Sequence, residues 1–330
     1  MARIAVTGVA GLLGSHFSRH LLDKGHEVVG IDNLSGGYRD FVDPRVHFFE
    51  ADLVRSEAVH GVFLYTKPDY VYHFAAYAAV GLSPFIRNFN YTNNIVASAN
   101  VVNNCINHDV KKVVFTSSMD VYGSHRPPYT EAMRPMPEDP YGIAKYAVEM
   151  DLEAANRMFG LKYSIVRPHN VFGVYQNIWD KYRNVIGIWI RQTLSGQPLT
   201  VFGDGLQVRA FSDIKYYMEP FEKLMTVGDS ETFNLGSDNH VTINELLGRF
   251  RLVASCRGYN PTVVRLTQRD EVYAAYSDHT KAANFLGFKD DTDLEDLIDK
   301  MFAWAETQPV REVREMTHEV DKKMYEYWKH

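Results

Sequence analysis

A tyrosine and a lysine four residues apart, Tyr141 and Lys145, open a segment with helical spacing that extends to Phe159. Side chains at this separation lie on one face of a helix, one turn apart. An ammonium group beside a phenol favours the phenolate, so Lys145 should lower the pKa of Tyr141 below its ordinary value of about 10. Such a tyrosine can accept a hydroxyl proton while a hydride leaves the same carbon. The pair therefore predicts chemistry at a carbon that carries a hydroxyl group.

Two more polar residues, Ser118 and Asp120, follow a short apolar run, residues 113–117, that we expect to be a strand. Open α/β sheets bind ligands at the carboxyl ends of their strands. The Ser118 hydroxyl would there hydrogen-bond the same substrate oxygen as Tyr141. The sequence leaves Asp120 open between two interpretations. It is either a base that acts on a carbon of the substrate or a side chain that accepts hydrogen bonds from backbone N–H groups of its loop.

A glycine pattern lies between the first strand-like run and the first helical segment, and it predicts a dinucleotide-binding loop. Gly8 permits the tight turn, Gly11 lets the backbone approach a pyrophosphate, and Gly14 lets helix and strand pack closely. Asp32 ends the next strand 18 residues after Gly14 and would bind both ribose hydroxyls while repelling a 2′-phosphate, which favours NAD over NADP. The residues predicted to bind the cofactor here are Gly8, Ala10, Gly11, Leu12, Leu13, Gly14, Asp32, Asn33, Asp52 and Leu53. Asp52 is a candidate for the adenine amino group or, equally, a helix N-cap.

These motifs need a parallel sheet to bring them together, and the first half of the chain alternates strand and helix signals as such a sheet requires. We predict an α/β fold: a Rossmann-type doubly wound parallel sheet over residues 1–170 and a smaller, mixed α/β substrate domain over 171–330, with part of 203–240 returning to the first domain. The expected strands are Arg3–Thr7, Glu27–Asp32, His47–Asp52, Tyr70–Ala75, Val113–Ser117 and Tyr163–Val166. Residues 310–330 are charged and aromatic and could form a surface helix, to which we assign no function.

The composition excludes several classes of protein. The 330 residues carry a formal charge of -6, which gives no electrostatic footprint for nucleic acid. The two cysteines, Cys105 and Cys256, lie in no metal-binding pattern, so we expect free thiols and no metal site. The N-terminus lacks the order of a signal peptide, and no run of apolar residues is long enough to span a membrane. A cytoplasmic location without membrane contact is therefore predicted.

Taken together, the motifs resemble the extended short-chain dehydrogenases/reductases, in the branch of NAD-dependent nucleotide-sugar epimerases and dehydratases. They occur in the family's order over almost the whole chain. The segments that carry the resemblance are TGVAGLLG (7–14), DNLSGG (32–37), HFAA (73–76), FTSSMDVYG (115–123), YGIAK (141–145), RPHNVFG (167–173), GDGLQVRAFSD (203–213) and SDHTKAANFLGF (277–288).

The resemblance implies a function for each matching residue. Tyr141 would be the catalytic base and acid, Lys145 its partner and a ligand of the nicotinamide ribose, and Ser118 the hydroxyl anchor. Residues implied to line the cofactor groove or to bind the substrate are Ala75 and Ala76 for the groove, Asn170 and Arg209 for the diphosphate, Gln176 at the nucleotide base, and Arg269 as a further phosphate ligand. The helical segments 93–107 and 141–159 resemble the part that forms a homodimer interface in this family.

The residues after Ser118 bear on the choice of reaction within the family. Dehydratases of this type carry Asp and Glu there, whereas this chain has Met119 and Asp120, and 3,5-epimerases carry a cysteine where Asp120 stands. C4 inversion of a UDP-sugar through a transient 4-keto sugar is therefore favoured. A dehydratase or C3/C5-epimerase that uses Asp120 as its base remains an alternative, and so does an NAD-binding regulator without catalysis.

Overall fold

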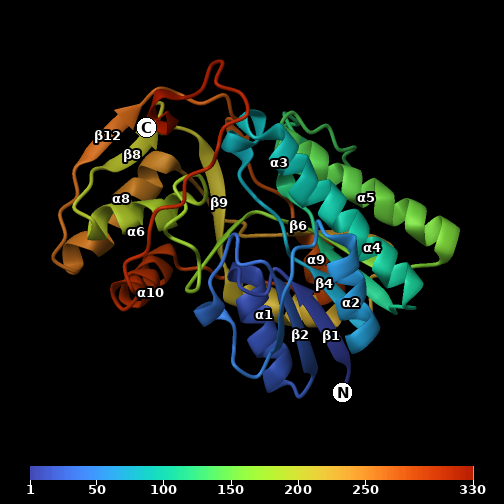
Figure 1. Ribbon diagram of the computed structural model, residues 1–330. Coiled ribbons are helices and arrows are strands. Elements are labelled where there is room, and N and C mark those ends of the chain that lie inside the picture. Colours follow the sequence, from blue (N-terminus) through green and yellow to red (C-terminus); the bar gives the residue numbers. More distant parts are fainter. Residues whose placement is uncertain (330) are drawn as a thin grey trace.

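A computed structural model describes residues 1–329 and contains a parallel sheet of seven strands, in the order β10-β6-β5-β4-β1-β2-β3 (Figure 1). Its strands are β1 (Arg3–Thr7), β2 (Glu27–Asp32), β3 (His47–Glu50), β4 (Tyr70–His73), β5 (Lys112–Thr116), β6 (Tyr163–Pro168) and β10 (Glu231–Leu235). The central strands are apolar and buried along their whole length, as parallel strands covered on both faces must be. The predicted Rossmann-type fold class is confirmed.

Helices cover both faces of this sheet. The helices on one face are α1 (Leu12–Asp23), α7 (Met218–Lys223) and α9 (Thr280–Leu286), which bury Phe17, Phe221 and Leu286 in a common core. The other face carries α2 (Ser56–Thr66), α4 (Ala97–Asn107) and α5 (Pro140–Phe159), with the short α3 (Arg87–Tyr91) and a π-helical turn (Thr92–Val96) leading into α4. The chain thus returns to the first sheet with α7 and β10 after residue 213, and the boundary near residue 170 stays a prediction.

A second apolar core lies beside the large sheet, among three helices and two small sheets. The helices are α6 (Val185–Leu194), α8 (Ile243–Cys256) and α10 (Leu294–Glu306). The strands are β7 (Asn170–Phe172), β8 (Leu199–Phe202), β9 (Val208–Asp213), β11 (His240–Thr242), β12 (Val263–Leu266) and β13 (Ala274–Ala275). β9 pairs with β7, β11 and β13, and β8 pairs with β12. Short 3₁₀ turns are η1 (Arg39–Phe41), η2 (Val80–Phe85), η4 (Met119–Tyr122), η5 (Ile214–Tyr217) and η6 (Glu326–Trp328).

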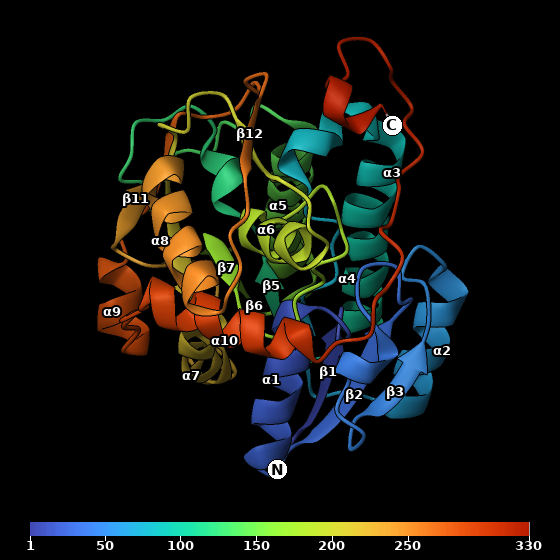
Figure 2. The same ribbon diagram turned by 90° about the vertical axis from the view of Figure 1, so that its left-hand side faces the viewer.

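The segment after α10, residues 308–329, is an extended tail and not the surface helix that its composition suggested. It runs from α10 across both cores to the neighbourhood of α3, as Figure 2 shows. Its only helical turn is η6. The tail stays extended because its polar groups pair with distant parts of the chain: the Glu319 carboxylate accepts hydrogen bonds from the N–H groups of Asn88 and Phe89, at 2.6 and 2.8 Å. None of the helices among residues 1–329 is long and apolar enough to cross a membrane.

Candidate active site

The glycine loop between β1 and α1 is held by contacts that leave no room for a side chain. Gly8 has a positive φ of 70°, and a Cβ at this position would lie 2.7 Å from the backbone nitrogen of Ala75. A Cβ on Gly14 would lie 2.2 Å from the carbonyl oxygen of Gly8. Gly11 is the N-cap of α1, and no side chain caps this helix end, so its first N–H groups point to the space above the loop. This is the arrangement that binds phosphate at a helix N-terminus.

Asp32 closes the other side of this loop. Its carboxylate accepts one hydrogen bond from the N–H of Ala10, at 3.0 Å, and one from the N–H of Leu34, at 2.8 Å. Burial nevertheless raises the pKa of Asp32. Each carboxylate oxygen keeps lone pairs for further donors, such as the two hydroxyl groups of a ribose.

A cleft with an empty volume of about 710 Å³ opens between the glycine loop and the carboxyl ends of β2, β3 and β4. Eight of the residues predicted to bind the cofactor line it: Gly8, Gly11, Asp32, Asn33, Asp52, Leu53, Ala75 and Ala76. The lining does not include the other residues predicted to bind the cofactor, which are Ala10, Leu12, Leu13, Gly14, Tyr141 and Lys145. Tyr77 and Arg183, which the sequence analysis did not single out, line the cleft as well.

The helix that carries Tyr141 and Lys145, α5, begins and ends at residues that are typical helix start and stop signals. Asp139 caps α5 by accepting hydrogen bonds from the N–H groups of Tyr141 and Gly142, at 2.8 and 3.1 Å, and Pro140 occupies the first helical position. The helix ends at Gly160, which takes the left-handed conformation. Tyr141 and Lys145 are buried, 5% and 3% exposed, and face the end of β5.

Ser118 lies at the carboxyl end of β5 and forms a close pair with Asp120. Its hydroxyl donates to a carboxylate oxygen of Asp120 at 2.7 Å and accepts from the Asp120 N–H at 3.1 Å. A hydrogen bond with the Ser118 side chain also lowers the pKa of Tyr141, so the serine stands between the phenol and the carboxylate. Within residues 1–329, no backbone N–H of the loop donates to the Asp120 carboxylate. The interpretation of Asp120 as an acceptor of backbone hydrogen bonds is therefore wrong.

The titration of Tyr141 differs from the expectation. Burial and the nearby Asp120 carboxylate raise the pKa of Tyr141, while Ser118 and Arg183 lower it. Lys145 is not among the main groups that lower the pKa of Tyr141, and burial lowers the pKa of Lys145 itself to about 7. Its ammonium nitrogen donates to the carbonyl oxygen of Thr116 at 2.7 Å and stands 5.8 Å from the centre of the Tyr141 ring. Spacing along a helix showed that the two side chains are neighbours and gave no measure of their burial.

Asp120 is partly buried among several charged groups. Burial and the Asp139 carboxylate raise its pKa to about 6, against the lowering effects of the Ser118 hydrogen bond and of Arg209. The group therefore changes charge close to neutral pH, which an exposed aspartate does not do.

The residues implied to bind the diphosphate and the nucleotide base lie in the strands of the second core or in the loops between its elements. Asn170 begins β7 and donates to the carbonyl oxygen of Ala210 at 3.1 Å. Arg209 pairs with Glu271, with 3.0 Å between a guanidinium nitrogen and a carboxylate oxygen. Gln176 is buried, and its carbonyl oxygen accepts no hydrogen bond from the described residues.

Arg269, the further phosphate candidate, is covered by the tail. Its guanidinium carbon stands 3.4 Å from the centre of the Phe202 ring and 4.9 Å from that of Trp328 in η6. Burial lowers the pKa of Arg269 to about 10, and its Nε atom donates to no described residue. A buried guanidinium with an unused donor is a site that an anion would satisfy.

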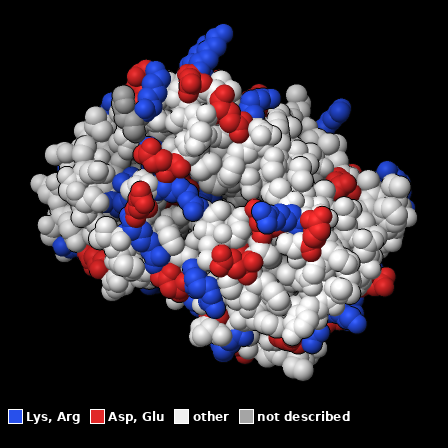
Figure 3. Space-filling model, in the orientation of Figure 1, with Lys and Arg blue, Asp and Glu red and all other residues white. Residues whose placement is uncertain are grey.

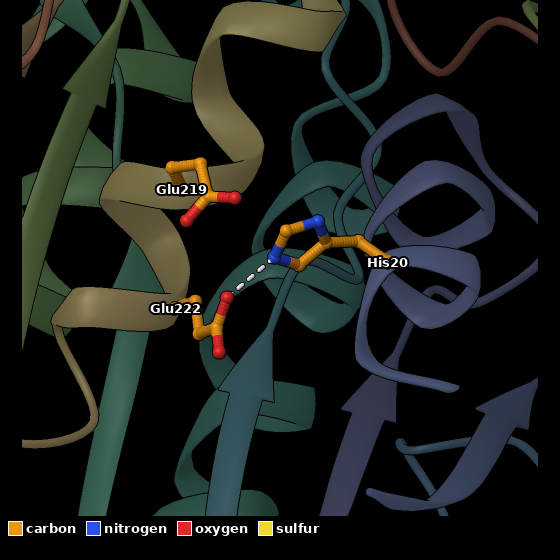
Figure 4. Close-up of side chains that lie close together, drawn as sticks. All are labelled: His20, Glu219 and Glu222. Carbon is orange, nitrogen blue, oxygen red and sulfur yellow. Dashed lines mark hydrogen bonds and ion pairs between the residues drawn. The ribbon is translucent and has the colours of Figure 1, made fainter. Parts of the chain in front are cut away.

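One group of potential metal ligands occurs among residues 1–329, on α1 and α7 (Figure 4). His20 points at Glu222, with 2.6 Å between its Nε2 atom and a carboxylate oxygen. Lys24 stands 3.0 Å from Glu219 and 3.6 Å from Glu222, so an ammonium group already compensates both carboxylates. We assign no metal to this group. On the face seen in Figure 3, acidic and basic side chains are intermixed.

Comparison with known proteins agrees with this geometry. Residues 4–236 match the model of the NAD dependent epimerase/dehydratase family. A putative UDP-glucose 4-epimerase of Methanocaldococcus jannaschii is 31% identical over 306 residues, which cover 91% of this chain and 97% of that protein.

Two solved structures are similar along nearly their whole length. A UDP-glucose 4-epimerase of Thermotoga maritima, crystallised with UDP-glucose, is 32% identical and superposes with a TM-score of 0.86, covering 92% of this chain and 98% of the other. A UDP-glucose 4-epimerase of Thermus thermophilus in complex with NAD is 28% identical with a TM-score of 0.86, covering 92% of this chain and 99% of the other.

Proposed function

The chain belongs to the NAD dependent epimerase/dehydratase family, and from this premise we propose that it is a nucleotide-sugar epimerase that inverts C4 of a UDP-sugar with bound NAD. The observation that carries the proposal is the meeting of Ser118 and Tyr141 at the end of β5, beside the cleft of the glycine loop. The relatives named above are UDP-glucose 4-epimerases, which supports UDP as the nucleotide.

Two features of the cleft suit NAD. A carboxylate at Asp32 favours free ribose hydroxyls and disfavours a 2′-phosphate. The uncapped N-terminus of α1 supplies N–H donors and a partial positive charge for the pyrophosphate. When bound, NAD supplies the acceptor and the donor for the hydride at C4 of the sugar.

The residues of the chain supply proton transfer and positioning. The positive charge of a bound nicotinamide ring would oppose the effects that raise the pKa of Tyr141. The Tyr141 phenolate would then take the proton of the sugar's C4 hydroxyl and return it after the sugar has turned its other face. The Ser118 hydroxyl, which donates to the Asp120 carboxylate in this structure, would turn to donate to the same sugar oxygen when the substrate binds. Lys145 lies one helical turn from Tyr141, where it would hold the ribose next to the reacting carbon.

Mass spectrometry in heavy water tests this function. The protein, NAD and a panel of nucleotide-sugars are incubated, and the products are separated and weighed. We expect an isomer of unchanged mass without solvent deuterium on carbon, since the hydride that leaves C4 is the one that returns. Loss of one water would instead indicate a dehydratase, and deuterium at C3 or C5 would make Asp120 the first candidate for a base that acts on carbon. A chain that binds NAD and converts no sugar of the panel would support the regulator.

A homodimer is part of the proposal. Helix α5 packs beside α4 and the π-helical turn that leads into it, and these elements leave apolar side chains in water, among them Val96 in the turn and Met150 in α5, each 47% exposed. Exposed apolar surface on paired helices is typical of an interface. Light scattering should therefore give twice the mass of the chain, and Met150→Glu should halve it. A monomeric mass for the unchanged protein would refute the dimer. The cytoplasm remains the predicted location, in keeping with the free Cys105 and Cys256 thiols.

A further inference from the structure

The cofactor cleft has an unusual balance of charge for a site that must hold a pyrophosphate. Its charged lining residues within the described chain are Asp32, Asp52 and Arg183. Two carboxylates and one guanidinium leave the lining with a net negative charge, whereas the pyrophosphate of NAD carries two negative charges. The N-terminus of α1 compensates only part of this charge, because its partial charge is about half an elementary charge. Arg183 is thus the one full positive charge that the lining offers.

Arg183 reaches the cleft from outside the glycine-loop region. It belongs to the segment between β7 and α6, just before Asn184, whose side chain caps α6. Two successive contacts link this segment, by way of residues 36 and 37, to the glycine loop. Asn177 donates to the carbonyl oxygen of Gly36 at 3.1 Å. Next to it, Gly37 lies so close to Ala10 that a Cβ would stand 2.0 Å from the Ala10 carbonyl oxygen. The segment is therefore locked against the glycine loop.

Neighbouring side chains hold the guanidinium group of Arg183 at the cleft. Its Nε donates to the Asp180 carboxylate at 2.8 Å, and Asp180 is 1% exposed. Its carbon stands 4.7 Å from the centre of the Tyr77 ring, on the cleft wall. The two Nη atoms lie 3.4 and 3.9 Å from the position that a Cβ on Gly36 would take. Among the described residues, no acceptor is hydrogen-bonded to either Nη group.

We propose that Arg183 clamps the cofactor: its two Nη groups bind the pyrophosphate of NAD across the cleft from the N-terminus of α1. Asp180 fixes the Nε side of the guanidinium, so the fork that remains is the one that binds phosphate in bidentate fashion. Because Arg183 belongs to the segment that leads into the substrate-side core, cofactor binding ties that core to the Rossmann sheet. This inference rests on the proposed use of NAD and adds a residue that lies outside the glycine motif.

Dissociation constants of three ligands test the clamp. NAD, ADP-ribose and adenosine are titrated by calorimetry into protein stripped of cofactor, at one salt concentration. For Arg183→Gln we expect binding of NAD and ADP-ribose to weaken about 10- to 100-fold, the loss typical of a charge-assisted hydrogen-bond pair. Adenosine, which lacks phosphate, should bind as before. Arg183→Lys should fall between, since an ammonium keeps the charge and loses the fork.

A control variant and the comparison of the three ligands show whether Arg183 acts on the phosphates or through the fold. Lys181→Gln removes the same charge two residues away, where Lys181 pairs with Glu315 at 2.8 Å, and should leave NAD binding unchanged. If Arg183→Gln binds NAD within about threefold of the unchanged protein, the clamp is refuted. Equal weakening for adenosine would also refute it, since Arg183 would then act through the fold. If the unchanged protein itself binds no NAD, the proposed function fails and not this inference alone.

Discussion

Replacing Asp120 by asparagine should make the protein more stable near neutral pH. The side chain is partly buried, and desolvation together with the charge of the Asp139 carboxylate raises its pKa from 3.8 to about 6. One pKa unit corresponds to about 1.4 kcal/mol, so the ionised side chain destabilises the fold by about 3 kcal/mol. An amide has the same shape, carries no charge, and still accepts the hydrogen bond from Ser118.

The dependence on pH gives this prediction its sign. Between about pH 4 and pH 6 the folded protein binds the Asp120 proton and the unfolded chain has released it. The stability that this group contributes is thus present at low pH and is lost as the pH rises through about 6. Asp120→Asn should therefore match the unchanged protein near pH 4, gain stability above it, and reach its full advantage of about 3 kcal/mol near pH 7.

Urea unfolding at several pH values between about 4 and 7 measures the difference. Asp321→Asn, the same chemical change on an exposed part of the tail, serves as the control and should show no such trend. A variant at position 120 that is less stable than the unchanged protein at pH 7 would refute the reasoning. So would an advantage that does not vary with pH, because the gain would then not come from the charge.

Three other substitutions test separate parts of the structure. Tyr141→Phe should lower kcat by about 10²- to 10⁴-fold while NAD stays bound, as proton transfer is lost; unchanged turnover would remove Tyr141 from catalysis. Gly14→Ala should abolish NAD binding in calorimetry, because its Cβ would lie 2.2 Å from the Gly8 carbonyl oxygen, whereas Gly61→Ala, with nothing within 4 Å, should bind normally. Trp328→Ala should cost about 3–5 kcal/mol in thermal unfolding, since the ring is only 1% exposed; an unchanged melting temperature would show that the tail is not part of the fold.

The parts of the site that sequence predicts well are those that the backbone dictates locally. The glycines at 8 and 14 are required by close contacts inside one strand–turn–helix unit, so their spacing carries the information. Asp139, Pro140 and Gly160 mark the ends of α5 in the same local way. Asp32 follows from the length of one β-α-β unit. These features are short-range, and one sequence is enough to find them.

Burial and electrostatics are not visible in spacing. The Tyr141–Lys145 motif predicted two neighbouring side chains, and the expected direction of the Tyr141 pKa was wrong because both groups lie deep in the protein. In the same way, one of the two interpretations of Asp120 had it accept hydrogen bonds from backbone N–H groups, whereas its carboxylate accepts a hydrogen bond from the Ser118 hydroxyl. The other interpretation, a base that acts on carbon, stays a prediction. The rotation of one hydroxyl depends on how η4 packs, and no pattern in the sequence records it.

Long-range contacts account for what the sequence did not reveal. Arg183 looks like any arginine in a loop until Asp180 and Asn177 fix it at the cleft. Arg269 was predicted as a phosphate ligand, and its stack with Trp328 depends on the path of the tail. The tail itself resembles a helix in composition. It is extended because residues more than 200 positions away supply its partners.

The tail also fixes the order in which the molecule is completed. Arg311 pairs with Asp40 across a separation of 271 residues, and the Glu319 carboxylate binds α3 across 230. The ribosome synthesises the chain from the N-terminus, so the tail emerges last. Contacts between residues so far apart in the sequence also form late because closing such a long loop costs conformational entropy. The Rossmann sheet up to β6 can assemble while the tail is still unmade. The molecule therefore finishes folding when the tail, which is synthesised last, packs over the two cores that formed before it. A chain whose synthesis stops before residue 311 would lack the tail that covers the apolar side chains of Tyr77, Leu82 and Phe85. These side chains would be exposed to water, and chaperones would bind such a chain.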